Sequence, residues 1–98
     1  MTNKIVKMGI LGCGRVAQHY RKIINLGEIK GLSVDACCDL DIEKAREMSN
    51  DFSSRSYDDY NLMLKENDLD VVVILTESGK HYDHAKFFLE MGKHVIVE

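Results

Sequence analysis

Residues 4–17 read Lys4-Ile5-Val6-Lys7-Met8-Gly9-Ile10-Leu11-Gly12-Cys13-Gly14-Arg15-Val16-Ala17. The apolar run from Ile5 to Leu11 predicts a buried strand, and the glycines that follow it predict a tight turn into a helix. Gly12 can adopt a positive φ, and Gly14 leaves the backbone bare, so a phosphate oxygen could reach the first amides of that helix. The stretch therefore predicts a pyrophosphate site, with Cys13, Arg15 and Val16 beside the two glycines.

The length and composition of the whole chain limit the class of protein. The chain has 98 residues, which predicts one domain, and a net charge of −3 with interspersed signs, which argues against a nucleic-acid surface. It contains no 18-residue apolar run and no signal region, so we expect no membrane span and a cytoplasmic location. Three cysteines, two of them adjacent, do not suggest a disulfide framework.

Strand and helix patterns alternate along the chain. They predict helices at 16–27, 42–49 and 81–91, a short helix after a Ser56–Asp59 capping box, and strands at 32–39, near Arg55, at 70–75 and at 94–97. Asp41 is the expected cap of the helix at 42–49, and Ala85, Phe88 and Leu89 are the expected inward side chains of the helix at 81–91. This alternation predicts an α/β, Rossmann-type, doubly wound and mainly parallel sheet.

Ligands of such sheets bind beyond the carboxyl ends of the strands. Asp39 follows the second strand and lies 22 positions past Ala17 (39 − 17), close to the interval at which dinucleotide-binding units place their ribose acid. Its carboxylate would repel a 2′-phosphate, and Leu40 is not the arginine that would accept one, so NAD is favoured over NADP. The alternative is that Asp39 only caps the turn that follows it.

The other candidates for the cofactor crevice also follow strands; they are Thr76, Glu77, Ser78, His81 and Glu98. Glu77 is either solvated or on the nicotinamide side. Cys13 is either a reactive thiol at a helix start or simply the middle residue of the turn. His81 and His84 could share a metal, but no further ligand stands at suitable spacing, so we expect no metal site.

Four segments resemble the Gfo/Idh/MocA family, named for glucose-fructose oxidoreductase and inositol dehydrogenase. They are Met8-Gly-Ile-Leu-Gly-Cys-Gly-Arg-Val-Ala17, Cys38-Asp-Leu-Asp41 with Glu43-Lys44-Ala45, Asp70-Val-Val-Val-Ile-Leu-Thr76 with His81, and Ala85 through Gly92-Lys-His-Val-Ile-Val-Glu98. The last matches the family's G-K-H-V-x-x-E-K-P hallmark up to its glutamate. The resemblance covers essentially the whole chain.

The resemblance implies an NAD(P)-dependent oxidoreductase that acts on a sugar or sugar-like alcohol and has a second domain for substrate and oligomer contacts. The family's usual catalytic lysine follows the hallmark glutamate, here Glu98, so the resemblance implies a cofactor-binding fragment without a catalytic residue. The family loop T-P-N-x-x-H reads Thr76-Glu77-Ser78-Gly79-Lys80-His81, which resembles members that act on nucleotide-linked sugars in polysaccharide synthesis.

Two other functions are compatible with the residues. An adenosyl-methionine-dependent methyltransferase also has a glycine turn after its first strand and an acid after its second, although its turn is usually looser. A non-catalytic domain that senses NAD would use the same crevice. We expect a homo-oligomer, because a sheet that ends at Val97 leaves an unpaired strand edge.

Overall fold

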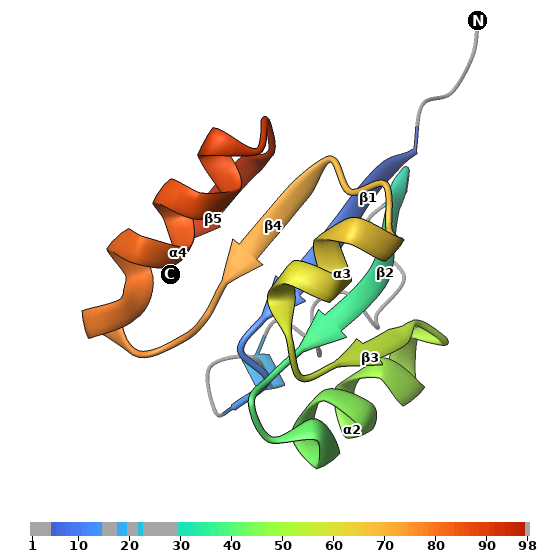
Figure 1. Cartoon of the computed structure of the whole chain (residues 1–98). Coiled ribbons are helices and arrows are strands. Elements are labelled where there is room, and N and C mark those ends of the chain that lie inside the picture. The colour runs from blue at the N-terminus through green and yellow to red at the C-terminus, as the bar shows by residue number, and fades with distance from the viewer. Residues whose placement is uncertain (1–4, 15–17, 20–21, 23–29, 98) are drawn as a thin grey trace, which may run out of the picture.

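Over the residues that the computed structural model describes, 5–14, 18–19, 22 and 30–97, the chain forms one sheet of five parallel strands (Figure 1). The strands are β1 (Val6–Leu11), β2 (Leu32–Cys38), β3 (Arg55–Tyr57), β4 (Val71–Ile74) and β5 (His94–Val97). Their order is β3-β2-β1-β4-β5. The chain thus builds outward from β1 first to one side and then to the other, which is the doubly wound arrangement that the sequence predicts.

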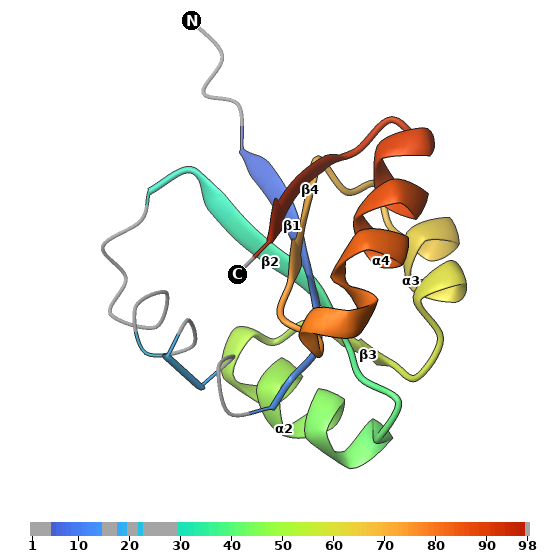
Figure 2. The same ribbon diagram turned by 90° about the vertical axis from the view of Figure 1, so that its left-hand side faces the viewer.

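Helices cover both faces of the sheet. α2 (Ile42–Phe52) lies on one face, and α3 (Tyr60–Glu66) and α4 (Ser78–Glu90) lie on the other (Figure 2). The predicted helix at 16–27 falls on residues that are mostly outside the described part of the chain. No helix among the described residues is long and apolar enough to cross a membrane.

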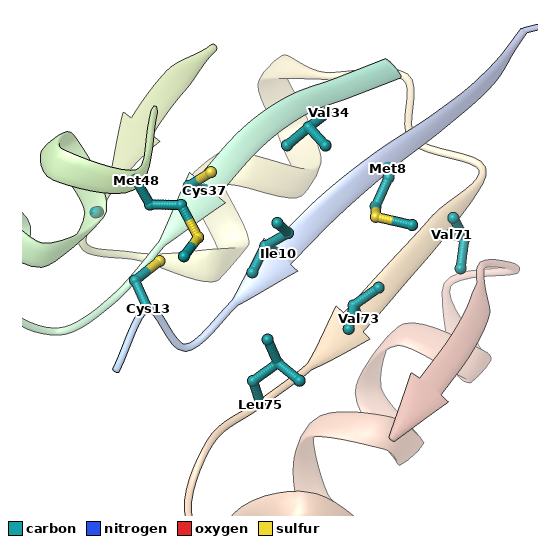
Figure 3. Close-up of a cluster of buried hydrophobic side chains, with 10 residues drawn as sticks. Met8, Ile10, Cys13, Val34, Cys37, Met48, Val71, Val73 and Leu75 are labelled. Atoms are coloured by element: carbon teal, nitrogen blue, oxygen red, sulfur yellow. The ribbon is translucent and has the colours of Figure 1, made fainter. Parts of the chain in front are cut away.

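Two apolar layers, one on each face, account for the buried side chains. β4 illustrates why both exist: all four residues of Val71–Ile74 are buried, and they alternate between the layers. The layer under α2 is shown in Figure 3 and contains Met8, Ile10, Cys13, Val34, Cys37, Ala45, Met48, Val71, Val73 and Leu75. The layer under α3 and α4 contains Leu11, Ala36, Cys38, Tyr57, Met63, Leu69, Val72, Ile74 and Phe88.

β2 contains an irregularity. Met8 pairs with Val34, whereas the next residue, Gly9, pairs with Ala36, so Asp35 is an extra residue in the ladder. Val34 belongs to the layer under α2, and Ala36 belongs to the opposite layer. After the bulge, the alternation of β2 side chains between the two layers is therefore shifted by one residue.

Several predicted boundaries need correction. α2 continues past Ser49 to Phe52 and ends where Ser53 adopts a left-handed conformation, with φ of 52°. The Ser56–Asp59 capping box is wrong: Ser56 lies in β3, and Asp59 itself is the N-cap, accepting from the Asn61 N–H at 2.9 Å. The Asp41 cap is confirmed, since Asp41 accepts from the Glu43 N–H.

α4 begins at Ser78, three residues before the predicted start at His81. Glu77 is the N-cap, and its carbonyl accepts from the Lys80 N–H at 2.9 Å, so the helical turns begin before His81. Phe88 is fully buried as predicted, but Leu89 is 59% exposed and does not face the core. Gly92, with φ of 79°, follows the end of α4 as predicted.

Candidate functional site

A cavity of about 500 Å³ lies at the carboxyl ends of β1, β2 and β4. The strand ends contribute Gly12, Gly14, Asp39, Leu40, Thr76 and Glu77, and the surrounding helices and loops contribute Lys44, Asp58, Tyr60, Lys80 and His84. A second cavity of about 550 Å³ lies at the opposite ends of the strands and is lined mainly by apolar side chains. We place the site in the first cavity, because parallel sheets bind ligands at their carboxyl edge and the glycine turn lies there.

The glycine turn is held close to the end of β4. Gly12 has φ of 97°, and a Cβ on it would lie 2.8 Å from the Leu75 carbonyl carbon and 2.9 Å from the Thr76 nitrogen. The Gly12 N–H donates to the Cys38 carbonyl at 2.8 Å, which ties the turn to β2 as well. The fold therefore requires glycine at position 12.

Gly14 has a different role. Among the described residues, no atom beyond its chain neighbours lies within 4 Å of the place where its Cβ would be, and it lines the cavity. Packing within the described residues does not explain this glycine, whereas a ligand that approaches the backbone closely would. This open position fits the pyrophosphate of a dinucleotide.

Asp39 is held by two backbone amides. One carboxylate oxygen accepts from the Cys13 N–H at 2.8 Å, and the other accepts from the Asp41 N–H at 2.9 Å. The two interpretations of Asp39 are therefore compatible, because it caps the following turn and also lines the cavity. Each oxygen retains a second lone pair, which a ribose hydroxyl can use.

The loop after β4 brings two histidines to Thr76. The Thr76 hydroxyl lies 2.9 Å from His84 Nδ1, and His81 Nε2 hydrogen-bonds to the Thr76 carbonyl. The His84 ring meets the Tyr60 ring edge-on, with centroids 5.3 Å apart. Burial lowers the pKa of His84, with a smaller contribution from Lys80 in the same direction.

The Cys13 side chain points away from this chemistry. It is 3% exposed and belongs to the apolar layer under α2 (Figure 3). A hydrogen bond with Cys37, together with burial, raises the pKa of the Cys13 thiol. These features favour Cys13 as a packed residue of the turn over a reactive thiol, and its contribution to the site is the backbone N–H that holds Asp39.

The structure thus places six of the predicted site residues around one cavity: Gly12, Gly14, Asp39, Leu40, Thr76 and Glu77. His81 supports Thr76 from behind, and Ser78 is the first residue of α4. Arg15, Val16 and Glu98 lie outside the described residues. Within the described part of the chain, no group of three or more His, Cys, Asp or Glu residues is arranged to hold a metal ion.

Eight lining residues were not among the predicted site residues. Leu11, Cys38 and Leu75 are apolar residues at strand ends, and the other five are Lys44, Asp58, Tyr60, Lys80 and His84. A signal for two of them was present, since Asp58 and Tyr60 stand just after β3, at the same edge of the sheet as the other candidates. Lys80 and His84 are four residues apart on α4, so they share a helical face.

Comparisons with known proteins show which family the chain is similar to. The sequence model of an oxidoreductase family with an NAD-binding Rossmann fold, GFO_IDH_MocA, matches residues 6–98. Inositol 2-dehydrogenase of Salmonella typhimurium is 29% identical over 96 residues, which are 95% of this chain and 28% of that protein. A glycosyl hydrolase family 109 protein of Streptomyces coelicolor is 28% identical over 103 residues, which are 95% of this chain and 21% of that protein.

Among solved structures, scyllo-inositol dehydrogenase from Lactobacillus casei, with bound NAD(H) and scyllo-inositol, superimposes with a TM-score of 0.85. It is 25% identical, and the match covers 96% of this chain and 28% of that one. The chain spans less than a third of the length of each of these relatives.

Proposed function

This chain belongs to the GFO_IDH_MocA oxidoreductase family, and we propose that residues 1–98 form the NAD-binding domain of an enzyme that transfers a hydride between nicotinamide and a substrate hydroxyl. The observation that carries the proposal is that Gly14 and Asp39 line the same cavity. Gly14 leaves the backbone open, and Asp39 presents a fixed carboxylate. Family membership disfavours the methyltransferase alternative.

Each part of the cofactor has a proposed partner. The turn from Gly12 to Val16 holds the pyrophosphate with backbone amides, and Asp39 with Leu40 receives the adenosine ribose. Thr76, Glu77, Ser78 and His81 form or support the nicotinamide side, and Glu98 closes the crevice. NAD, when bound, supplies the hydride chemistry, while these residues bind and orient it.

Selectivity for NAD over NADP follows from charge. Asp39 is anionic and lines the cavity beside Leu40, so a 2′-phosphate would meet a fixed negative charge. Lys44 also lines the cavity but belongs to α2 rather than to the loop directly after β2. We therefore propose NAD as the cofactor.

The substrate proposed for the parent enzyme is a sugar, a cyclic polyol or a nucleotide-linked sugar. The support is twofold: one relative is an inositol 2-dehydrogenase, and a structural relative holds scyllo-inositol with NAD(H). The Thr76-Glu77-Ser78 loop is the basis for the nucleotide-sugar option and for a role in polysaccharide synthesis. The Streptomyces relative carries the name of a glycosyl hydrolase family 109 protein.

The catalytic group and the substrate domain would come from other parts of the parent protein. We propose a cytoplasmic homo-oligomer. The support for assembly is β5, which is an edge strand of the described sheet and exposes Ile96 and Val97 at 44% and 45%. A sensor that only binds NAD would share the cofactor site, but the family's description as oxidoreductases favours the enzyme.

Isothermal titration calorimetry of the chain with NADH tests the proposal. Asp39→Asn keeps the size of the side chain but removes the charge and one of the two oxygens that accept from the Cys13 and Asp41 N–H groups. We expect it to weaken NADH binding about tenfold or more. It should also narrow the preference for NADH over NADPH, because the repulsion of the 2′-phosphate is lost. Asp35→Asn is the matched control, since Asp35 lies in β2 outside the cavity.

Two results would contradict the proposal. One is the absence of NADH binding by the wild-type chain. The other is equal NADH affinity in Asp39→Asn and wild type, which would leave Asp39 as a cap of the turn and nothing more.

A further inference from the structure

Thr76 is held at two points by the helix that follows it. His81 Nε2 hydrogen-bonds to the Thr76 carbonyl, and His84 Nδ1 lies 2.9 Å from the Thr76 hydroxyl oxygen. A carbonyl oxygen can only accept, so His81 Nε2 carries a proton. The first contact fixes the Thr76 backbone, and the second leaves open which of two groups donates.

The His84 ring has a fixed position from which to act. It packs edge-on against Tyr60, whose ring also meets Phe87 at a centroid distance of 5.0 Å. His84, Tyr60 and Thr76 all line the cavity. The hydroxyl of Thr76 and the ring that contacts it therefore lie at the surface where the proposed cofactor binds.

His84 is kept neutral in this setting. Burial lowers its pKa most, the charges of Lys80 and His81 lower it further, and Asp83 on the same helix opposes them. Across the cavity, the other charged lining groups are Asp39, Lys44, Asp58 and Glu77. A neutral ring carries one proton, so its Nδ1 either donates to the Thr76 hydroxyl or accepts from it.

The two arrangements have opposite effects on a ligand. If Nδ1–H donates to Thr76 Oγ1, the hydroxyl proton is free to turn into the cavity. If Thr76 donates to Nδ1, only lone pairs face the cavity. The proposed function places Thr76 at the nicotinamide side of the cofactor, where ribose and phosphate oxygens can accept a hydrogen bond. The first arrangement gives Thr76 a proton to donate to such an oxygen, whereas the second leaves it none.

We propose that His84 is a positioning residue, whose Nδ1–H donates to Thr76 Oγ1 and thereby directs the Thr76 hydroxyl proton toward an acceptor oxygen of the bound dinucleotide. The inference rests on the proposed NAD site and goes beyond it, because the role falls on a side chain that the sequence pattern did not select. Thr76 makes the hydrogen bond to the dinucleotide, and His84 determines that the Thr76 hydroxyl is the donor in it.

Two substitutions at position 84 separate the hydrogen bond to Thr76 from the ring packing against Tyr60. His84→Phe keeps a ring against Tyr60 but has no donor, and we expect it to weaken NADH binding about three- to tenfold. His84→Asn loses the ring but can place an amide donor near the position of Nδ1, and we expect binding within about twofold of wild type. A purely structural role predicts the reverse order. His94→Asn, on exposed β5, is the matched control.

Thr76 supplies the second arm. Thr76→Val should weaken NADH binding as His84→Phe does, Thr76→Ser should restore it, and His84→Phe should cost nothing more in the Thr76→Val background. Nitrogen-15 NMR of the imidazole in the NADH-bound wild-type chain reads the tautomer directly. We expect the proton on Nδ1 of His84.

The outcomes distinguish the two proposals. If the wild-type chain does not bind NADH, the proposed function fails and this inference fails with it. If it binds NADH but His84 carries its proton on Nε2, or His84→Phe binds as tightly as wild type, only this inference is overturned.

Discussion

Gly12→Ala is the substitution whose effect the structure defines most closely. The backbone at Gly12 has φ of 97°, where an alanine is strained by about 1–3 kcal/mol. Its Cβ would also lie 2.8 Å from the Leu75 carbonyl carbon and 2.9 Å from the Thr76 nitrogen. These are backbone atoms of the neighbouring strand end, so relief requires β1 and β4 to separate, and such overpacking costs a further ~1–3 kcal/mol.

The sum, about 2–6 kcal/mol, is a large part of the ~5–15 kcal/mol that a domain of this size has in total. Urea unfolding followed by circular dichroism measures it. With a slope near 2 kcal/mol/M, the midpoint should fall by about 1–3 M. Before the measurement, the folded fraction of Gly12→Ala in the absence of urea should be checked, because the variant could lie close to its unfolding transition.

Gly14→Ala is the matched control, since it makes the same change two residues along. In the described part of the chain, no atom beyond its neighbours in sequence lies within 4 Å of its Cβ position, and its φ is not in the left-handed region, so we expect stability within about 0.5 kcal/mol of wild type. NADH binding should nevertheless weaken, because the methyl group projects where the phosphate approaches. Equal stability of Gly12→Ala and Gly14→Ala would refute the reasoning, since it would show that the close approach of β4 does not constrain the turn.

Two further predictions concern α4. Gly79→Ala places a methyl group in open space in the first turn of α4, so the chain should gain up to about 1 kcal/mol, seen as a rise in Tm of a few degrees; a fall would mean that α4 does not begin at Ser78. The lowered pKa of His84 means that the unfolded chain takes up a proton more readily than the folded one, so stability should decline as pH falls through about 6.5. This decline in stability should be shallower in His84→Asn than in wild type. If the urea midpoints of the two proteins depended on pH in the same way, His84 would not be its source.

The order of the elements could be predicted because both faces of the sheet are covered. A strand such as Val71–Ile74 is then apolar throughout, and short apolar runs bounded by polar residues stand out from helical spacing. Boundaries were less predictable where a local pattern had two interpretations. Ser56 and Asp59 have the spacing of a capping box, but pairing with β2 draws Ser56 into β3 and leaves Asp59 as the cap.

The site divides in the same way. Gly12, Gly14 and Asp39 could be found because their roles depend on backbone conformation and on their place directly after a strand. The contact of His84 with Thr76 could not, because it depends on where α4 begins. In the helix that starts at Ser78, His81 and His84 both reach Thr76, which lies two residues before the helix begins.

The extra residue in β2 has a consequence for how this sheet can change. In a regular strand, side chains alternate between the two faces of the sheet, so residues i and i+2 always belong to the same layer. With Asp35 inserted, Leu32 and Val34 join the layer under α2, whereas Ala36 and Cys38 join the layer under α3 and α4. β2 is in effect two short strands in opposite phase, joined end to end. Substitutions of buried residues in its first half therefore affect the layer under α2 alone, whereas those in its second half affect both layers, because Cys37 packs under α2 between Ala36 and Cys38.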